Sequence, residues 1–286
     1  MIVIVGCIVV ITAVLTGFTW AGGHFAALIH PSEIVTIGGA ALGSLIVMSP
    51  KKVLVDLVRG LVQCVKGTPY NRRAYEELFK ALYDLFRLAR REGLIVLESH
   101  LSRPEESPLF QKYPTILRNH HITEFLSGAL TPLIEGTVRP EQLPALLQAE
   151  LNVIEEEHHA PLGVLSKTAD ALPGFGIVAA VLGIVITMGS IDGPVEEIGE
   201  KVGAALVGTF LGILMSYGFF APLAVRMEFL GAAELAFFRT IATSIQGFAN
   251  DLPPKVAVEQ ACRGVVSEMR PNRAELDELF AAVEAS

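Results

Sequence analysis

Positive charge is missing from long stretches of this sequence. Residues 1–50 contain no lysine or arginine, and Glu33 is their only acid. Residues 169–224 contain one base, Lys201, and five acids. Charged residues occupy 18% of the 286 positions, whereas a typical soluble domain has about 25%. Because charge is confined to the other segments, the sequence indicates a chain divided between lipid and water.

Other scarcities exclude further classes of protein. Acidic residues outnumber basic ones by 30 to 22, and the net charge of −8 argues against a nucleic-acid binder. Three cysteines, Cys7, Cys64 and Cys262, are too few for a disulfide framework, and we expect free thiols. The sequence has no GxSxG, phosphate-loop or HExxH motif. We therefore expect neither an enzyme nor a bound cofactor or metal.

Two short motifs have chemical interpretations that their context disfavours. Residues 174–179 have the GxGxxA spacing of a dinucleotide site, but they open an uncharged run of membrane length instead of a soluble helix. Residues 155–159 combine three acids with two histidines. Neighbours in sequence do not share a helix face, which favours a solvated charge run over a metal site. A membrane metalloenzyme built on this cluster stays open as an alternative, as does a passive membrane scaffold.

Four apolar runs predict membrane helices. A helix needs about 20 residues to cross a hydrocarbon core of roughly 30 Å. We predict an all-α integral membrane protein with two helical hairpins, at residues 1–50 and 169–225. The four membrane helices are expected at about 1–20, 34–50, 171–191 and 202–224. The second is short for a span, and local thinning of the bilayer would accommodate it.

Basic residues near the helix ends predict the orientation. The turn at 22–33 has no lysine or arginine, whereas Lys51, Lys52 and Arg59 follow the second helix and Arg226 follows the fourth. Cytoplasmic flanks carry the excess of basic residues. We therefore expect a multi-pass membrane protein with both termini and the long loop in the cytoplasm.

The charged segments are expected to be helical and cytoplasmic. Residues 51–168 form the predicted domain between the second and third membrane helices, and residues 226–286 form a helical tail. Apolar residues recur at helical spacing between residues 72 and 97. Another helix is expected at 141–157.

Small residues and two prolines mark the third and fourth predicted membrane helices. Close backbone contact at glycine, alanine and serine drives helix association in lipid, and the stripes are Gly176, Ala180, Gly183 and Thr187 on one helix and Ala205, Gly208, Thr209, Gly212 and Ser216 on the other. These faces pack either against each other or around another chain. Pro173 and Pro222 either end helices or form a paired bending point.

No acid, lysine, arginine or histidine is expected deep within the four helices. Ionisable residues inside a membrane usually mark proton pathways, and this chain places hydroxyls such as Thr209 and Ser216 there instead. If the chain forms part of a proton path, a partner must supply the carboxylate.

Three motifs resemble the last two membrane helices of MotA, the A subunit of the bacterial flagellar stator. They are PGFGIVAAVLG at 173–183, VGTFLGIL at 207–214 and YGFFAPL at 217–223. The order of the expected segments, four helices with a long loop after the second and a helical tail, matches this family over essentially the whole chain.

The resemblance implies partners and a mechanism. Subunits of this family form a ring, a pentamer, around a MotB-type dimer whose membrane aspartate carries the proton. Proton passage moves the ring and turns the rotor protein FliG, so that proton motive force drives swimming. An energiser of outer-membrane processes of the ExbB/TolQ type is the alternative, and its three membrane helices would distinguish it from the four predicted here.

The resemblance also implies roles for single residues. Pro173 and Pro222 match the prolines that couple proton passage to movement, and Thr209 matches a threonine facing the ion path. Ala180 stands where sodium-driven relatives carry a hydroxyl, which favours protons. Arg90 and Glu98 match rotor-facing charges, and Glu150 is a weaker match; these three residues complete the implied site.

The spacing of Arg90 and Glu98 gives a separate expectation. They are eight residues apart, about two helical turns. If the helix continues through Gly93, both side chains lie on one exposed face, where charges steer association with a partner. Ordinary solvated side chains are the alternative.

Overall fold

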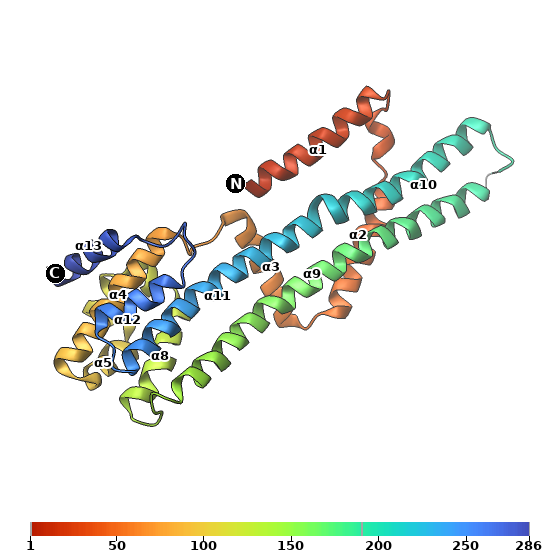
Figure 1. Ribbon diagram of the computed structural model, residues 1–286. Coiled ribbons are helices and arrows are strands. Elements are labelled where there is room, and N and C mark those ends of the chain that lie inside the picture. Colours follow the sequence, from red (N-terminus) through yellow and green to blue (C-terminus); the bar gives the residue numbers. More distant parts are fainter. Residues whose placement is uncertain (1, 190, 286) are drawn as a thin grey trace. The chain divides into compact units, whose positions relative to one another are not determined.

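The computed structural model describes residues 2–189 and 191–285, and this part of the chain contains helices and no strand (Figure 1). The chain divides into two compact units. The first combines the residues up to Gly67 with Glu157–Leu230, and the second combines Thr68–Glu156 with the residues from Gly231 onward. Each unit is described by itself below.

The first unit holds the membrane helices. Four helical stretches are long and apolar enough to cross a bilayer: Ile2–Trp20, Phe25–Met48, Leu143–Met188 and Val195–Ala249. The predicted all-α fold with four membrane helices is therefore confirmed. The elements are α1 (Ile2–Trp20), η1 (Phe25–Leu28), α2 (Pro31–Met48), α3 (Lys51–Lys66), α9 (Leu143–Met188), α10 (Val195–Met215), the turn η4 (Ser216–Phe220) and α11 (Ala221–Ala249), of which α9 and α11 contribute to both units.

Helix α9 is longer than the sequence pattern predicts. Separate helices were expected at 141–157 and 171–191, but a single helix covers Leu143–Met188. Pro161 and Pro173 lie inside it. Proline is tolerated within such helices where local adjustments satisfy the carbonyl that it leaves free. The interpretation of Pro173 as a residue that ends a helix is therefore wrong.

Pro222 also lies within a helical run. It is the second residue of α11 and follows the π-helical turn η4, in which the Ala221 N–H donates to the Ser216 carbonyl five residues earlier. A proline ring clashes with the carbonyl four residues before it, here that of Gly218. A π-helical turn widens the helix at this point, and so makes room for the ring.

Amphipathic α3 packs against α9 and the start of α11. Leu57 and Cys64 share a buried cluster with Leu165, Ala224 and Met227. Lys52 at the start of α3 forms an ion pair with Glu157 of α9. Apolar burial on one face and charge on the other is the pattern of a surface helix.

The second unit has an aromatic core around α4 (Arg72–Glu92). Asn71 caps this helix by accepting from the Ala74 N–H at 3.0 Å. Phe79 and Phe86 are fully buried, and Phe86 stacks on Phe248 of α11 at 4.4 Å between ring centroids. The remaining elements are η2 (Leu94–Val96), α5 (Leu97–Ser102), η3 (Pro104–Glu106), α6 (Pro108–Gln111), α7 (Pro114–Leu117), α8 (His120–Ile134), α12 (Pro254–Arg263) and α13 (Arg273–Glu284).

Candidate functional site

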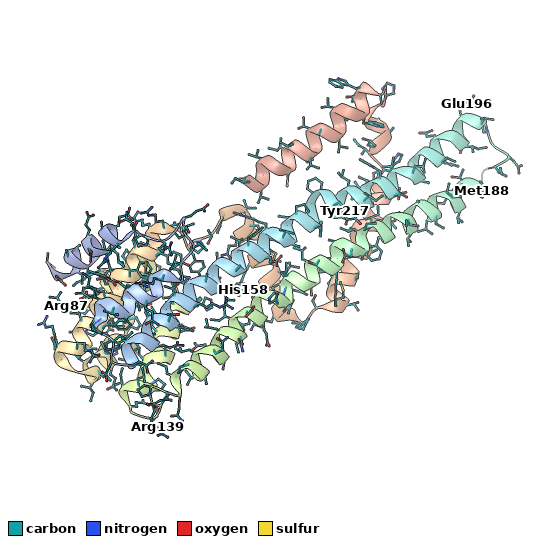
Figure 2. All side chains as sticks on the ribbon, viewed as in Figure 1. Arg87, Arg139, His158, Met188, Glu196 and Tyr217 are labelled. Atoms are coloured by element: carbon teal, nitrogen blue, oxygen red, sulfur yellow. The ribbon has the colours of Figure 1, made fainter. Side chains whose placement is uncertain are left out.

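Glycines bring α9 and α10 into backbone contact. A methyl group added to Gly212 would lie 2.7 Å from the Leu172 carbonyl oxygen and 2.8 Å from the Gly176 Cα. One added to Gly183 would lie 2.7 Å from the Ala205 Cβ. Figure 2 shows the side chains along these helices, with Met188 and Glu196 labelled near the ends that are joined to each other. Glycines of both small-residue stripes thus serve packing within the chain.

Helix α2 adds a third element to this contact. Its buried residues are Glu33, Ile37 and Ala41, which follow one another at intervals of four and so share one face. Ile37 and Ala41 form a buried cluster with Leu172 and Ala179 of α9. The carboxylate of Glu33 therefore lies on the face of α2 that packs inside the bundle.

Glu33 lies just before the predicted membrane helix 34–50, in the first turn of α2, and the sequence analysis did not expect its carboxylate to be buried. The surface of Glu33 is 7% exposed, and its carboxylate oxygen Oε2 has no hydrogen-bond partner among the described residues. A methyl group at Gly208 of α10 would lie 2.5 Å from this oxygen. An alanine at position 208 would therefore require the carboxylate to move from this place. The signal that sequence analysis missed is the spacing of Glu33 with the apolar positions 37 and 41.

Ala180 and Thr209 lie next to this contact but are not enclosed by it. Both residues are half-buried. A methyl group on Gly176 would lie 3.3 Å from the Thr209 Cα, so Thr209 borders the α9–α10 seam. Ile177 and Val181, the neighbours of Ala180 in sequence or on the helix face, are exposed. The edge of the seam therefore offers a hydroxyl and a small side chain to whatever covers it.

Hydroxyls inside the seam are partly satisfied by backbone. Thr187 is fully buried and donates to the Gly183 carbonyl at 2.8 Å. Ser216, at the start of the π-helical turn, is buried with an Oγ that has no hydrogen-bond partner in the described chain. Pro173 is half-buried on α9, one of the two seam helices, and Pro222 is exposed on α11, which follows α10 through the π-helical turn.

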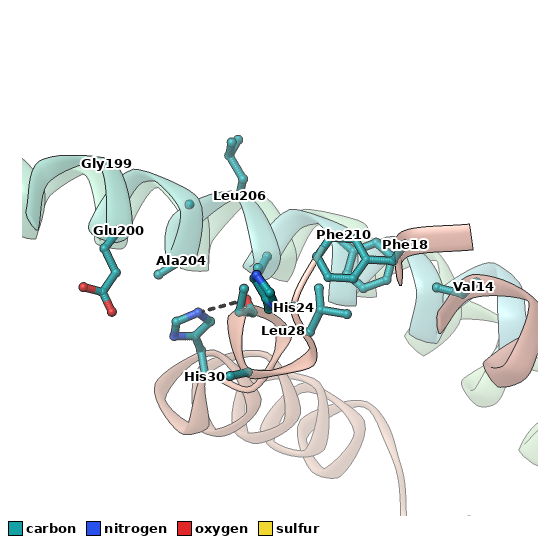
Figure 3. Close-up of a pocket in the computed structure, with 14 residues that line it drawn as sticks. Val14, Phe18, His24, Leu28, His30, Gly199, Glu200, Ala204, Leu206 and Phe210 are labelled. Carbon is teal, nitrogen blue, oxygen red and sulfur yellow. Dashed lines mark hydrogen bonds between the residues drawn. The ribbon is translucent and has the colours of Figure 1, made fainter. Parts of the chain in front are cut away.

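A cavity of about 860 Å³ lies between α1, the η1 turn and α10 (Figure 3). Its walls are mostly apolar, including Phe18 and Phe210, and its polar groups are His24, His30 and Glu200. The His30 Nε2 lies 3.2 Å from the Ala27 carbonyl oxygen. The cavity thus places water-accessible polar groups beside the turn from which α2 begins.

Arg90, in the second unit, is held by the end of α11 and the segment after it. Its guanidinium donates to the Asp251 carboxylate at 3.1 Å and to the Leu252 carbonyl at 3.3 Å, and it lies 5.4 Å from the centre of the Phe248 ring. The side chain nevertheless keeps 40% of its surface exposed. Arg90 can therefore present its charge outward from a fixed position.

The expectation that Arg90 and Glu98 share one helix face is wrong. Helix α4 ends at Glu92, and Gly93 adopts a positive φ of 91°, which glycine tolerates and which breaks the helix. Glu98 is exposed in the first turn of the separate helix α5. The two charges therefore project from different helices.

Glu150 is placed differently from both. It lies on α9 outside the predicted membrane helix, with its carboxylate beside Gly128 of α8. Burial raises the pKa of this carboxyl. The structure does not give Glu150 the exposure that Arg90 and Glu98 have.

The remaining motifs hold no assembled chemical site. Residues 174–179 lie within α9, with no strand before them in the described chain. No group of three or more histidine, cysteine or acidic residues among those described is arranged to hold a metal ion.

Comparison with known proteins gives consistent matches over the whole chain. The family model described as Motility protein A N-terminal matches residues 4–93, and the model of the MotA/TolQ/ExbB proton channel family matches residues 117–234. Motility protein A of Salmonella typhimurium is 35% identical over 283 residues, which cover 99% of this chain and 96% of that protein. Chemotaxis protein LafT of Vibrio parahaemolyticus is 34% identical, with 98% of each chain covered.

Solved structures share the fold. The structure of C. jejuni MotAB matches with a TM-score of 0.76 and 22% identity, over 95% of this chain and 98% of that one. The Bacillus subtilis flagellar MotAB stator complex matches with a TM-score of 0.74 and 21% identity, over 94% and 98%. Together with the full-length identity above 30%, these findings place the chain in the Motility protein A family of the MotA/TolQ/ExbB proton channels.

Proposed function

We propose that this chain is the A subunit of a proton-driven flagellar stator that works with a MotB-type partner. Its family consists of stator and proton-channel subunits of the inner membrane, so the chain is not an enzyme. The observation that carries the proposal is the 35% identity to Motility protein A over nearly the entire chain. An energiser of the ExbB/TolQ type is not favoured, because the Motility protein A N-terminal model covers the first hairpin.

The partner supplies the membrane aspartate. The described residues 171–189 and 202–225 contain no acid, and Glu33 is the only acid in residues 1–50. Several copies of this chain, five by the resemblance, surround the partner's two helices. Exposed apolar residues of α9, including Ile177, Val181 and Val185 at intervals of four, form a stripe suited to that packing or to lipid.

The ion follows the edge of the α9–α10 seam, where Thr209 supplies a hydroxyl. Ala180 adds no oxygen ligand there, which favours protons because a sodium ion needs several oxygens to replace its water. Pro173 interrupts the backbone hydrogen bonding of α9, and Pro222 interrupts that of α11, which continues the helical run of α10. Both prolines allow these helices to bend when the partner's carboxylate changes charge.

Force passes to the rotor through the second unit. Arg90 and Glu98 are exposed and of opposite sign, and they meet complementary charges on the rotor protein FliG. Glu150, half-buried on α9, is the weaker candidate for contact with the rotor. Both termini and the second unit lie in the cytoplasm in this proposal, which the basic residues after α2 and Arg226 support.

Two prolines of one helix test the mechanism. Pro173→Ala restores a backbone hydrogen bond at the proposed bending point, and we expect motility to be lost while membrane insertion and partner binding persist. Pro161→Ala makes the same change 12 residues earlier in α9 and should leave swimming intact. Each variant is expressed with the host's B-type subunit in stator-deleted cells, and swimming speed is measured. Motile Pro173→Ala cells would contradict the proposed coupling.

A further inference from the structure

Glu33 is a titratable group that the stator mechanism above does not use. It is the only acid, lysine or arginine in residues 1–50, yet its residue is 93% buried inside the bundle of α2, α9 and α10. An ionised carboxylate in apolar surroundings is costly unless it is paired or hydrogen-bonded. A buried carboxylate is therefore expected to have a partner or to bind a mobile cation.

Glu33 has no recorded ion-pair partner among residues 2–189 and 191–285. Its neighbours across the contact are Ala179 of α9 and Gly208 of α10, and Oε2 lacks a hydrogen bond among the described residues. The nearest charges in sequence on those two helices are Asp170 and Lys201. Lys201 is seven residues from Gly208, about 10 Å along the helix, and it lies in the turn of α10 that pairs it with Glu197 at 2.8 Å. Among the described residues, no ion pair of the Glu33 carboxylate is recorded and its Oε2 accepts no hydrogen bond.

The cavity borders the turn that carries Glu33. His30 accepts the Glu33 N–H through its backbone oxygen at 3.1 Å, and the same residue lines the cavity of about 860 Å³. Val207, the neighbour of Gly208 in α10, also lines that cavity. His24, His30 and Glu200 are the titratable groups along its walls (Figure 3). The cavity thus adjoins both elements that hold the carboxylate.

We propose that Glu33 is a proton-binding site of this chain, on the cavity side of the path, which takes up the transported proton before the partner's carboxylate does. A carboxylate oxygen with no fixed partner accepts the proton, and the buried group is then neutral. Release restores the carboxylate, so one proton enters and one leaves in each cycle. Gly208 leaves space for this oxygen in its present position, because the methyl group of an alanine there would lie 2.5 Å from it and displace it. This inference rests on the proposed stator function.

Proton uptake by proteoliposomes that hold the chain with its B-type subunit tests the site. Glu33→Gln keeps the size of the side chain and removes the acid. We expect proton uptake to fall by about tenfold or more. The loss stays below the roughly 100-fold that a positioned proton-transfer group contributes, because water can bypass this residue. Glu33→Asp keeps a carboxyl and should retain more uptake than Glu33→Gln. Glu196→Gln alters an exposed acid at the start of α10 and serves as the matched control.

Each outcome decides between the two proposals. Wild-type uptake in Glu33→Gln overturns the proton-binding site, and so does equal loss in Glu33→Asp and Glu33→Gln, which would indicate a packing role. Absence of uptake by the wild-type complex overturns the stator function itself. If Glu33→Gln does not assemble, Gly208→Ala decides, because its methyl group displaces the carboxylate: reduced uptake supports the site and wild-type uptake overturns it.

Discussion

Gly212 is the position where one added methyl group should force α9 and α10 apart. The methyl group of Gly212→Ala would meet the Leu172 carbonyl oxygen at 2.7 Å and the Gly176 Cα at 2.8 Å. Carbon atoms pack best at about 3.5–4.0 Å, and both opposing atoms belong to backbone. The helices must therefore separate by roughly 1 Å along this seam.

The expected cost follows from these contacts. Overpacking of a tight interface costs about 1–3 kcal/mol, and alanine returns at most about 1 kcal/mol through its better helix propensity. We expect a net loss of about 1–2 kcal/mol, equivalent to a fall in Tm of several degrees at about 2–4 °C per kcal/mol. Thermal unfolding of the purified protein in detergent, followed by circular dichroism, measures it.

Gly203 of the same helix is the matched control. A methyl group there meets no atom within 4 Å, so Gly203→Ala should be neutral or slightly stabilising. The comparison cancels the effect of alanine on helix propensity. If Gly212→Ala proved as stable as Gly203→Ala, the α9–α10 seam would not be limited by backbone contact, and the packing role assigned to its glycines would be wrong.

Two further predictions concern the second unit. Arg90→Ala should reduce swimming and lower the free energy of unfolding by about 1 kcal/mol, because it removes a partly exposed ion pair and a cation–π contact. Arg91 is the exposed neighbour, and Arg91→Ala should change stability little. Equal losses of stability in the two variants would refute the anchoring contacts of Arg90. The pKa of the Glu275 carboxyl is lowered from 4.5 by a hydrogen bond from the Asn272 N–H and by the nearby Arg72. The stabilisation that the ionised carboxylate gives to the fold is therefore present above pH 4.5 and is lost as the pH falls through the lowered pKa. Glu275→Gln should therefore lower Tm at neutral pH and not at pH below the folded pKa, while Glu278→Gln should be neutral at both.

The membrane helices could be predicted because lipid imposes a strong rule. Charged side chains and unpaired backbone groups are excluded from the hydrocarbon core, so uncharged runs reveal the spans. Nothing comparable marks where a helix continues beyond the membrane. The helix Leu143–Met188 is predicted as two from the sequence, because an uncharged run shows where a span lies and not that a helix continues beyond it.

The site was only partly predictable, because depth depends on how helices pack. In the sequence, Glu33 is an acid at the edge of an apolar run. Its contact with Gly208 in the structure shows that the side chain is enclosed. The separation of Arg90 from Glu98 depends on the positive φ of Gly93, a conformation that glycine permits but does not require. The small-residue stripes were correctly recognised, whereas their partner, α9 against α10, required the structure.

The most direct test compares proton uptake by proteoliposomes that hold this chain alone with uptake by those that hold it together with its B-type subunit. The account predicts negligible uptake by the chain alone, since Glu33 is a single station without the partner's aspartate, and rapid uptake by the complex. Equal rates in the two preparations would contradict a path completed by a partner.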